Sequence, residues 1–204
     1  MGQEINISNI ATISGLTMEQ VLDKMVEKKI GISSGATSSV PGAFGSDTIN
    51  GRLIAGETVQ FDGMYWIVVH TDYVNRVAYL ASTIIVTETP FGTNTAYKGS
   101  TLAAVAANFE KGISAKALSV MKNVTVNGVT AKVFAPSREQ VVSTFSYFKQ
   151  TTNRICQYNG VNFQWWTSSL DDSYRPYCIN MNGDIPGIHA GTVCGFRPFI
   201  ALAL

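Results

Sequence analysis

The stretch GDIPGIHAGTVCGFRPFIAL, residues 183–202, lies close to the end of the chain and joins two unlike halves. Its first half is a run of small, polar and β-branched residues that follows neither a helical nor a strand period. Its second half begins at Gly195 with Gly-Phe-Arg-Pro and continues as an apolar segment, which predicts a core strand. An irregular segment therefore directly precedes the strand that closes the core.

The composition predicts a folded chain with a sizeable core. The 204 residues are 46% hydrophobic and 14% charged, with a net charge of +1. We expect no nucleic-acid partner, because there is no basic excess or Lys/Arg cluster. No apolar run is long enough for a membrane-spanning helix, and the N-terminus lacks the pattern of a signal peptide. The expected partners are therefore neither nucleic acid nor membrane.

Residues 1–50 are predicted to form a separate N-terminal segment. Thr17 and Gln20 make a capping box that opens a short amphipathic helix to about Lys29. Residues 33–47 are rich in Gly and Ser and are typical of a linker. The helix either packs on its own domain or mediates self-association or docking onto a larger assembly, and the sequence leaves both possibilities open.

Residues 51–204 are predicted to form one domain of α+β class, because a hairpin is followed by helices and then by late strands. A turn is expected at Asn127-Gly128. The expected strands are residues 57–61, 64–71, 76–85, 132–136, 163–169, 177–182 and 195–204, and the expected helices begin at Ser100, Ser114 and Ser137.

Common catalytic and metal-binding motifs do not occur. The sequence has no phosphate loop, no GxSxG and no HExxH. His70 lies in an apolar strand and is interpreted as a hydrogen-bonded structural residue. Calcium needs six to eight oxygen ligands, and the region around Asp171 and Asp172 adds only Asp184. We therefore expect no metal, no cofactor and no enzymatic activity.

Two features near the C-terminus concern packing. Trp165 and Trp166 are adjacent on a strand and point to opposite faces, so at least one is expected in the core. The other packs under a loop or forms a floor beneath a binding surface. The three cysteines form no CxxC pair and are expected as free thiols, although Cys178 and Cys194 could meet across neighbouring strands.

Five stretches, taken together and in order, resemble C-type-lectin-like domains of phages and gut bacteria. The similarity is to the branch that includes the variable proteins of diversity-generating retroelements and phage receptor-binding proteins. It covers roughly residues 53–204 and implies a C-type-lectin-like domain preceded by the short helix and linker. The five stretches are FDGMYWIVVHTD (61–72), KVFAPSREQV (132–141), WWTSS (165–169), INMNGDI (179–185) and CGFRPFIAL (194–202).

This resemblance implies that residues 168–193 lie on the outer face of a rigid frame, where they can vary. In diversified members the randomised codons cannot encode Lys, Glu, Gln, Met or Trp. Residues 168–193 contain one residue of these types, Met181. The calcium-dependent lectins carry acidic sugar-binding motifs such as Glu-Pro-Asn, which this chain lacks.

The predicted ligand-binding residues come from this region. Strand alternation places Tyr177, Ile179 and Met181 on a face that is mostly core, and it places Cys178 on the other face with two asparagines. Aromatic and Arg side chains are expected to contribute most of the binding energy. The predicted site consists of Asp171, Asp172, Ser173, Tyr174, Arg175, Asn180, Asn182, Asp184, Pro186, Ile188, His189, Ala190 and Thr192.

The expected function is that of a non-enzymatic binding protein, a phage virion component that recognises a host-surface protein or glycan. The N-terminal helix would attach it to other virion proteins or to copies of itself. One alternative is a capsid or tail decoration protein without a specific ligand. An enzyme is a further alternative, since formylglycine-generating enzymes share a related fold, but the cysteines lack an evident helper residue.

Overall fold

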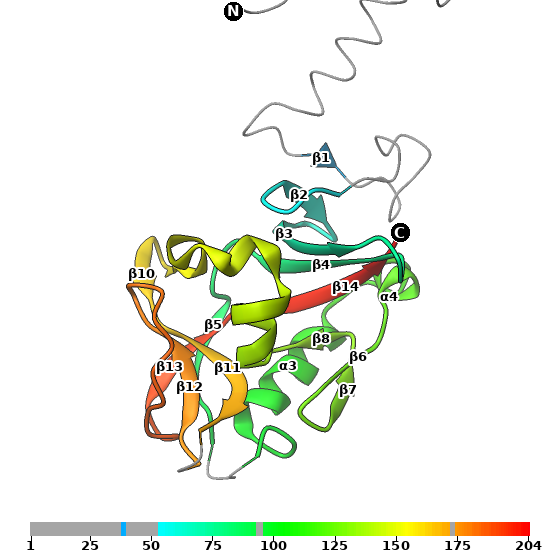
Figure 1. The fold of residues 1–204 in the computed structure, drawn as a ribbon. Coiled ribbons are helices and arrows are strands. Elements are labelled where there is room, and N and C mark those ends of the chain that lie inside the picture. Colours follow the sequence, from blue (N-terminus) through cyan, green and yellow to red (C-terminus); the bar gives the residue numbers. More distant parts are fainter. Residues whose placement is uncertain (1–37, 40–52, 93–95, 172–173) are drawn as a thin grey trace, which may run out of the picture. The chain divides into compact units, whose positions relative to one another are not determined.

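The computed structural model describes residues 38–39, 53–92, 96–171 and 174–204 (Figure 1). The predicted N-terminal helix and most of the predicted linker lie outside the described residues, as do Asp172 and Ser173 of the predicted site. The predicted domain boundary near residue 50 therefore stays a prediction.

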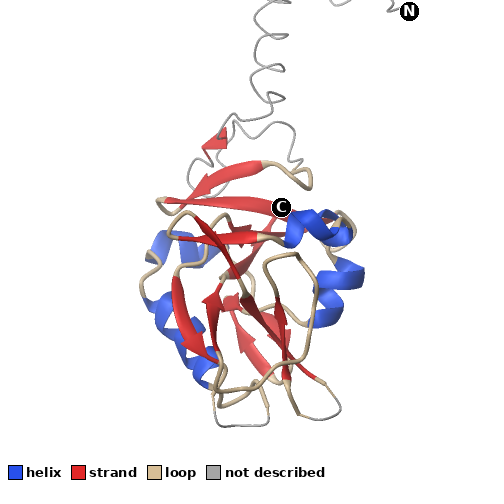
Figure 2. Cartoon of the chain, turned by 90° about the vertical axis from the view of Figure 1, so that its left-hand side faces the viewer, coloured by secondary structure: helices blue, strands red, loops and turns tan. Residues whose placement is uncertain are grey.

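Strands dominate the described part of the chain, and short helices lie at their margins (Figure 2). The helical elements are α3 (Thr101–Lys111), α4 (Ala115–Val120), the π-helical turn η2 (Gln140–Thr144) and the 3-10 turns η3 (Ser146–Lys149) and η4 (Thr151–Arg154). The strands are β1 (Ser38–Ser39), β2 (Thr58–Phe61), β3 (Met64–Asp72), β4 (Val77–Ser82), β5 (Thr87–Pro90), β6 (Val124–Val126), β7 (Val129–Ala131), β8 (Val133–Phe134), β9 (Cys156–Tyr158), β10 (Val161–Phe163), β11 (Trp165–Leu170), β12 (Pro176–Ile179), β13 (Val193–Phe196) and β14 (Phe199–Ala203).

The predicted α+β class is wrong, because the described part is mostly β, with 40% strand and 22% helix. The predicted helix starts are present: Ser100 Oγ accepts from Ala103 N (3.1 Å), and Ser137 and Gln140 make a reciprocal capping box. The helices that follow are short. The third continues as Val-Val-Ser-Thr, whose β-branched residues disfavour a helix, and it ends as the five-residue π-helical turn η2.

Two larger sheets and two hairpins organise the strands. One sheet has the order β1-β2-β3-β4-β14-β8 and the other the order β12-β11-β13-β5, while β6–β7 and β9–β10 pair separately. In Figure 1, β11, β12 and β13 lie together and away from β2 and β3. The predicted strands do not include β1, β5, β9 and most of β10, since each is short and lacks a clear alternating pattern.

The closing segment, expected as one strand over residues 195–204, is divided between the two sheets. β13 pairs with β11 and β5, whereas β14 pairs with β4 and β8. Arg197 and Pro198 form the corner between them, and Pro198 O accepts a hydrogen bond from Ser82 N (2.9 Å). Proline has no N–H to donate to a ladder, which suits the point where pairing changes sheets.

Both tryptophans of β11 belong to the core. Trp166 packs in the cluster that contains Phe91, and Trp165 packs in the second cluster with Phe148 and Phe199. Each is fully buried, and each indole N–H reaches a backbone carbonyl, Trp165 that of Arg154 and Trp166 that of Thr89, both at 2.9 Å. Among the described helices, none has the length and apolar character needed to cross a membrane.

Candidate functional site

Asp171 braces the turn between β11 and β12. Its backbone N–H donates to Arg175 O (2.8 Å), and its carboxylate accepts from the Arg175 backbone N–H (2.8 Å) and from Nε (2.9 Å). Arg175 Nη2 adds an ion pair at 2.8 Å, in which the Asp171 side chain is 12% exposed and that of Arg175 is 58% exposed. The carboxylate of Asp171 therefore ties Arg175 to the end of β11.

Tyr174 stands at the tip of this turn with a positive φ of 58° and 67% of its surface exposed. Its backbone N–H donates to Asp171 O (3.0 Å). The left-handed conformation costs a residue with a Cβ roughly 1–2 kcal/mol. Among the described non-glycine residues with positive φ, Tyr174 is the only aromatic one; the others are Asp62, Arg76, Asn127 and Asn159. No burial offsets this strain.

The turn after β12 is organised by Asn180. Its side-chain Oδ1 accepts from Asn182 N and from Asp184 N, both at 2.9 Å. Gly183 has a φ of 85°, and a Cβ there would lie 2.2 Å from Thr151 O. The turn is therefore fixed against η4, and the Asn180 amide is engaged inside it.

The segment after this turn, residues 185–192, looks irregular in sequence. Its first part lies alongside β12 and is hydrogen-bonded to it. Cys178 N donates to Pro186 O, and Ile188 N donates to Pro176 O, both at 3.0 Å. Ile188 and Ala190 are partly buried and pack against the core cluster of Trp166. His189 is exposed, and its Nδ1 accepts from Gly191 N (3.1 Å). The stretch looks irregular in sequence because its order comes from pairing with β12.

The structure divides the predicted site between the two ends of β12, a strand about 10 Å long. Tyr174 and Arg175 lie directly before β12. The segment 186–188 runs antiparallel to β12, so His189, which follows Ile188, lies at the same end of β12. We call Tyr174, Arg175 and His189 the tip surface. Asn182 and Asp184 are exposed at the other end, Pro186 is exposed between the two ends, and Asp171, Asn180, Ile188, Ala190 and Thr192 are partly buried.

The predicted alternation along β12 is wrong at two positions. Met181, expected in the core, is 57% exposed, because β12 ends at Ile179 and the chain turns. Cys178, expected on the face of Asn180 and Asn182, is fully buried, because the strand is covered on both faces. Tyr177 is half-buried, with the Arg138 guanidinium 5.1 Å from its ring centre.

Cys178 and Cys194 are free, fully buried thiols. Their thiols interact although β11 lies between β12 and β13, so the contact that the sequence left open across neighbouring strands spans a third strand instead. Donation of its thiol proton to Cys178, together with burial, raises the pKa of Cys194 far above its ordinary range. Because the thiolate is the reactive form, Cys194 is a packing residue. In the described ranges, no group of three or more His, Cys, Asp and Glu side chains could hold a metal ion.

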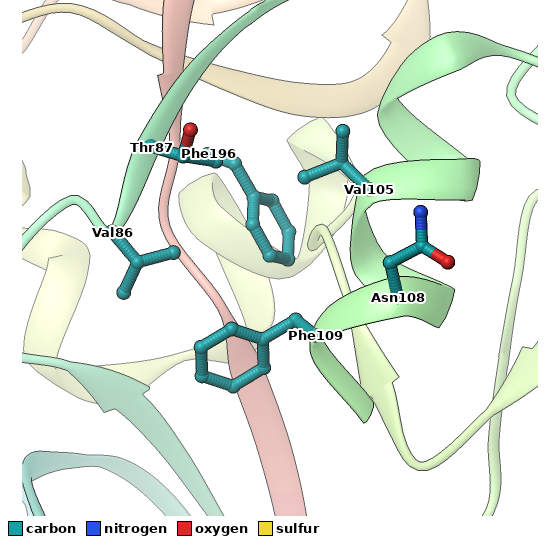
Figure 3. A pocket seen from close by; sticks show the side chains of 6 residues that line it. All are labelled: Val86, Thr87, Val105, Asn108, Phe109 and Phe196. Carbon is teal, nitrogen blue, oxygen red and sulfur yellow. The ribbon is translucent and has the colours of Figure 1, made fainter. Parts of the chain in front are cut away.

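An apolar pocket of about 330 Å³ lies between α3, β13 and the start of β5. Figure 3 shows the rings of Phe109 and Phe196 near each other, with Val86 and Val105 beside them. The two rings meet edge to face, with centres 6.1 Å apart. Asn108 and Thr87 supply the polar atoms of the lining. The lining contains no titratable group, so this pocket offers no acid–base chemistry.

A second, more polar pocket of about 230 Å³ lies beside the β11–β12 turn. Its lining comes from three separate parts of the chain: Ala96 and Tyr97, Asn127 of the β6–β7 turn, and Ser168, Ser169 and Leu170 of β11. The sequence predicts Asn127 only as a turn residue. No local pattern indicates that its amide reaches Ser168, 41 residues away.

Comparison with protein-family models found no match, and no curated protein or solved structure matches the chain significantly.

Proposed function

We propose that this chain is a non-enzymatic binding protein, a phage virion component that recognises a protein or glycan on the host surface through its tip surface. The observation that carries the proposal is the exposed, conformationally strained Tyr174 on a turn that Asp171 and Arg175 brace. Backbone strain at an exposed site is more often a functional feature than a stabilising one.

The side chains of the tip surface have the chemistry of binding anchors. Tyrosine and arginine are enriched among the residues that dominate binding energy, and the ion pair with Asp171 reduces the side-chain freedom that Arg175 loses on association. The polar groups near them already have partners: Asp171 pairs with Arg175, and His189 Nδ1 accepts from Gly191 N. These paired groups favour a binding surface over acid–base catalysis, because proton transfer needs a base that has no other partner.

The test replaces Tyr174 with Asn, which tolerates the left-handed conformation and lacks the aromatic ring. We expect Tyr174→Asn to keep or raise the free energy of unfolding, by up to about 1 kcal/mol, because strain is relieved. We expect binding of the labelled protein to a panel of bacterial strains to fall at least tenfold.

The matched control is Arg76→Asn. Arg76 is exposed and has a φ of 53°, so this variant relieves the same strain outside the site. It should bind as wild type does. If Tyr174→Asn binds normally, the tip surface is not the contact site. If the wild-type protein binds no strain but assembles into particles, the decoration role replaces the proposed one.

A further inference from the structure

Four Asn-Gly pairs occur in the chain, at residues 50–51, 127–128, 159–160 and 182–183. The first pair lies outside the described residues, and the asparagines of the other three lie in turns. An asparagine before a glycine can lose its side-chain amide without an enzyme, because glycine has no Cβ to keep the side-chain carbonyl away from its backbone nitrogen. The three turns hold the atoms that would react in different ways.

The β6–β7 turn and the β9–β10 turn are closely matched in backbone. In each, a two-residue turn joins two antiparallel strands, with Val126 opposite Val129 and Tyr158 opposite Val161. The asparagine has a φ of 47° in the first turn and 51° in the second, and the glycine has a φ of 81° and 79°. The φ angles therefore do not distinguish the two pairs.

The asparagine side chains of these two turns have different surroundings. Asn127 Nδ2 donates to Ser168 O (2.8 Å) and to Ser168 Oγ (2.9 Å), so its amide is held. Asn159 and Gly160 are exposed, and the described structure gives neither the Asn159 amide nor the Gly160 N–H a hydrogen-bond partner. A Cβ at Gly160 would meet nothing within 4 Å, which leaves room for a new ring at this position.

The third pair is held through its glycine. Gly183 is buried, its N–H donates to Asn180 O (3.0 Å), and its carbonyl accepts from Arg154 Nη1 (3.3 Å). A backbone nitrogen engaged in this way must lose its hydrogen bond before it can react. Among the three described Asn-Gly pairs, only that of Asn159 has both its amide and its glycine N–H without a partner.

We infer that Asn159 is a site of spontaneous deamidation in the folded protein. The Gly160 nitrogen, after losing its proton to hydroxide, attacks Cγ of Asn159 and closes a cyclic imide. The bond from Cγ to the side-chain nitrogen breaks, and this nitrogen takes a proton from water and leaves as ammonia. Water then hydrolyses the ring, at Cγ to give aspartate or at the main-chain carbonyl to give isoaspartate. No atom is oxidised or reduced.

The reaction changes the charge and the backbone of the turn. Either product replaces a neutral amide with a carboxylate, so the formal net charge of the chain falls from +1 to 0. β9 and β10 form a sheet of their own and the turn between them is exposed, so we expect the product to stay folded. The site shares no residue with the tip surface, so the inference does not depend on the proposed function.

The experiment incubates the full chain in mildly alkaline buffer made with heavy-oxygen water and then maps its peptides by mass spectrometry. Hydrolysis of the imide incorporates the heavy oxygen, which marks the reaction at each asparagine. We expect Asn159 to react at least about tenfold faster than Asn127 or Asn182, because each of these must first give up a hydrogen bond of ordinary strength. An equal or slower reaction at Asn159 overturns the inference.

The same incubation in denaturant is the control for the fold. The hydrogen bonds are then absent, so the rates at Asn127, Asn159 and Asn182 should converge. If the tenfold difference persists in denaturant, the neighbouring sequence sets it, and the structural inference is wrong.

Two matched variants test the route. Gly160→Ala places a Cβ beside the attacking nitrogen and should suppress the reaction at Asn159. Gly128→Ala, the same substitution in the β6–β7 turn, should leave the rate at Asn159 unchanged. A reaction at Asn159 that survives Gly160→Ala, or that yields aspartate without isoaspartate, overturns the imide route.

Discussion

His70 lies on β3 in a mainly aromatic environment, with its ring centre 6.2 Å from that of Tyr79 and 6.3 Å from that of Phe145. Its buried Nδ1 has no hydrogen-bond partner in the described structure, so the sequence interpretation as a hydrogen-bonded residue is wrong for this atom. Burial lowers the pKa of His70 below its ordinary 6.5; Asp72 opposes this shift and Lys149 adds to it.

The lowered pKa predicts that the free energy of unfolding decreases as pH falls from about 7.5 to 5.5. In this window the unfolded histidine takes up a proton more readily than folded His70 does, so the unfolded state binds more protons. His70→Gln should flatten this part of the pH dependence in urea unfolding. His189→Gln, at an exposed position, should leave the slope as in wild type. An unchanged slope in His70→Gln would contradict the prediction.

At the scale of elements, the turn after β12 is fixed by its contact with η4. Gly183 and Gly160 both have positive φ, at 85° and 79°, but a Cβ at Gly160 would meet nothing within 4 Å. At Gly183 it would collide with Thr151 O, and Arg154 Nη1 donates to Gly183 O (3.3 Å). Gly183 lies within residues 168–193, the region expected to vary freely, and it is constrained by its contact with η4.

This difference predicts unequal costs for the same substitution. Gly160→Ala should destabilise the domain by about 1–2 kcal/mol, the cost of the left-handed conformation alone. Gly183→Ala should cost roughly 2–5 kcal/mol, because the collision adds to the same conformational cost. Thermal and urea unfolding measure both. Equal costs would show that the turn does not depend on Thr151.

At the scale of the whole described domain, Arg197 sits at the corner where the chain passes from one sheet to the other. It is 3% exposed, and its Nε donates to Ser82 O (2.9 Å). Its guanidinium lies 5.3–5.9 Å from the ring centres of Trp165, Phe148 and Phe199. Nη1 has no partner within the described residues. The charge is therefore stabilised by stacking and by one carbonyl.

This environment predicts that Arg197→Met is less destabilising than Arg197→Lys. Methionine fills similar space without a buried charge and should cost about 1.5–3 kcal/mol, the value of one charged hydrogen bond. Lysine keeps the charge, is more strongly hydrated and cannot stack flat on the rings. Chemical denaturation ranks the two variants. The opposite order would mean that the charge itself holds the corner.

The sequence by itself determined the short-range turns and helix caps of this protein. The turn at Asn127-Gly128 and the capping residues Ser100 and Ser137 are where their residue chemistry predicts. Each depends on interactions within about four residues, so the sequence contains all the information needed. The exposure of Tyr174, Arg175 and His189 also follows from their loop positions, while their role in binding stays a proposal.

Only the tertiary structure decided which segments pair and which residues of the predicted site face solvent. The division of residues 193–203 between two sheets, the burial of Ile188 and the exposure of Met181 depend on partners far away in the sequence. The α+β prediction failed for the same reason, since pairing with distant strands, and not local propensity, sets how much of the chain becomes strand. The pocket of Asn127 and Ser168 likewise exists only because the β6–β7 turn packs against β11, a contact that no local pattern specifies.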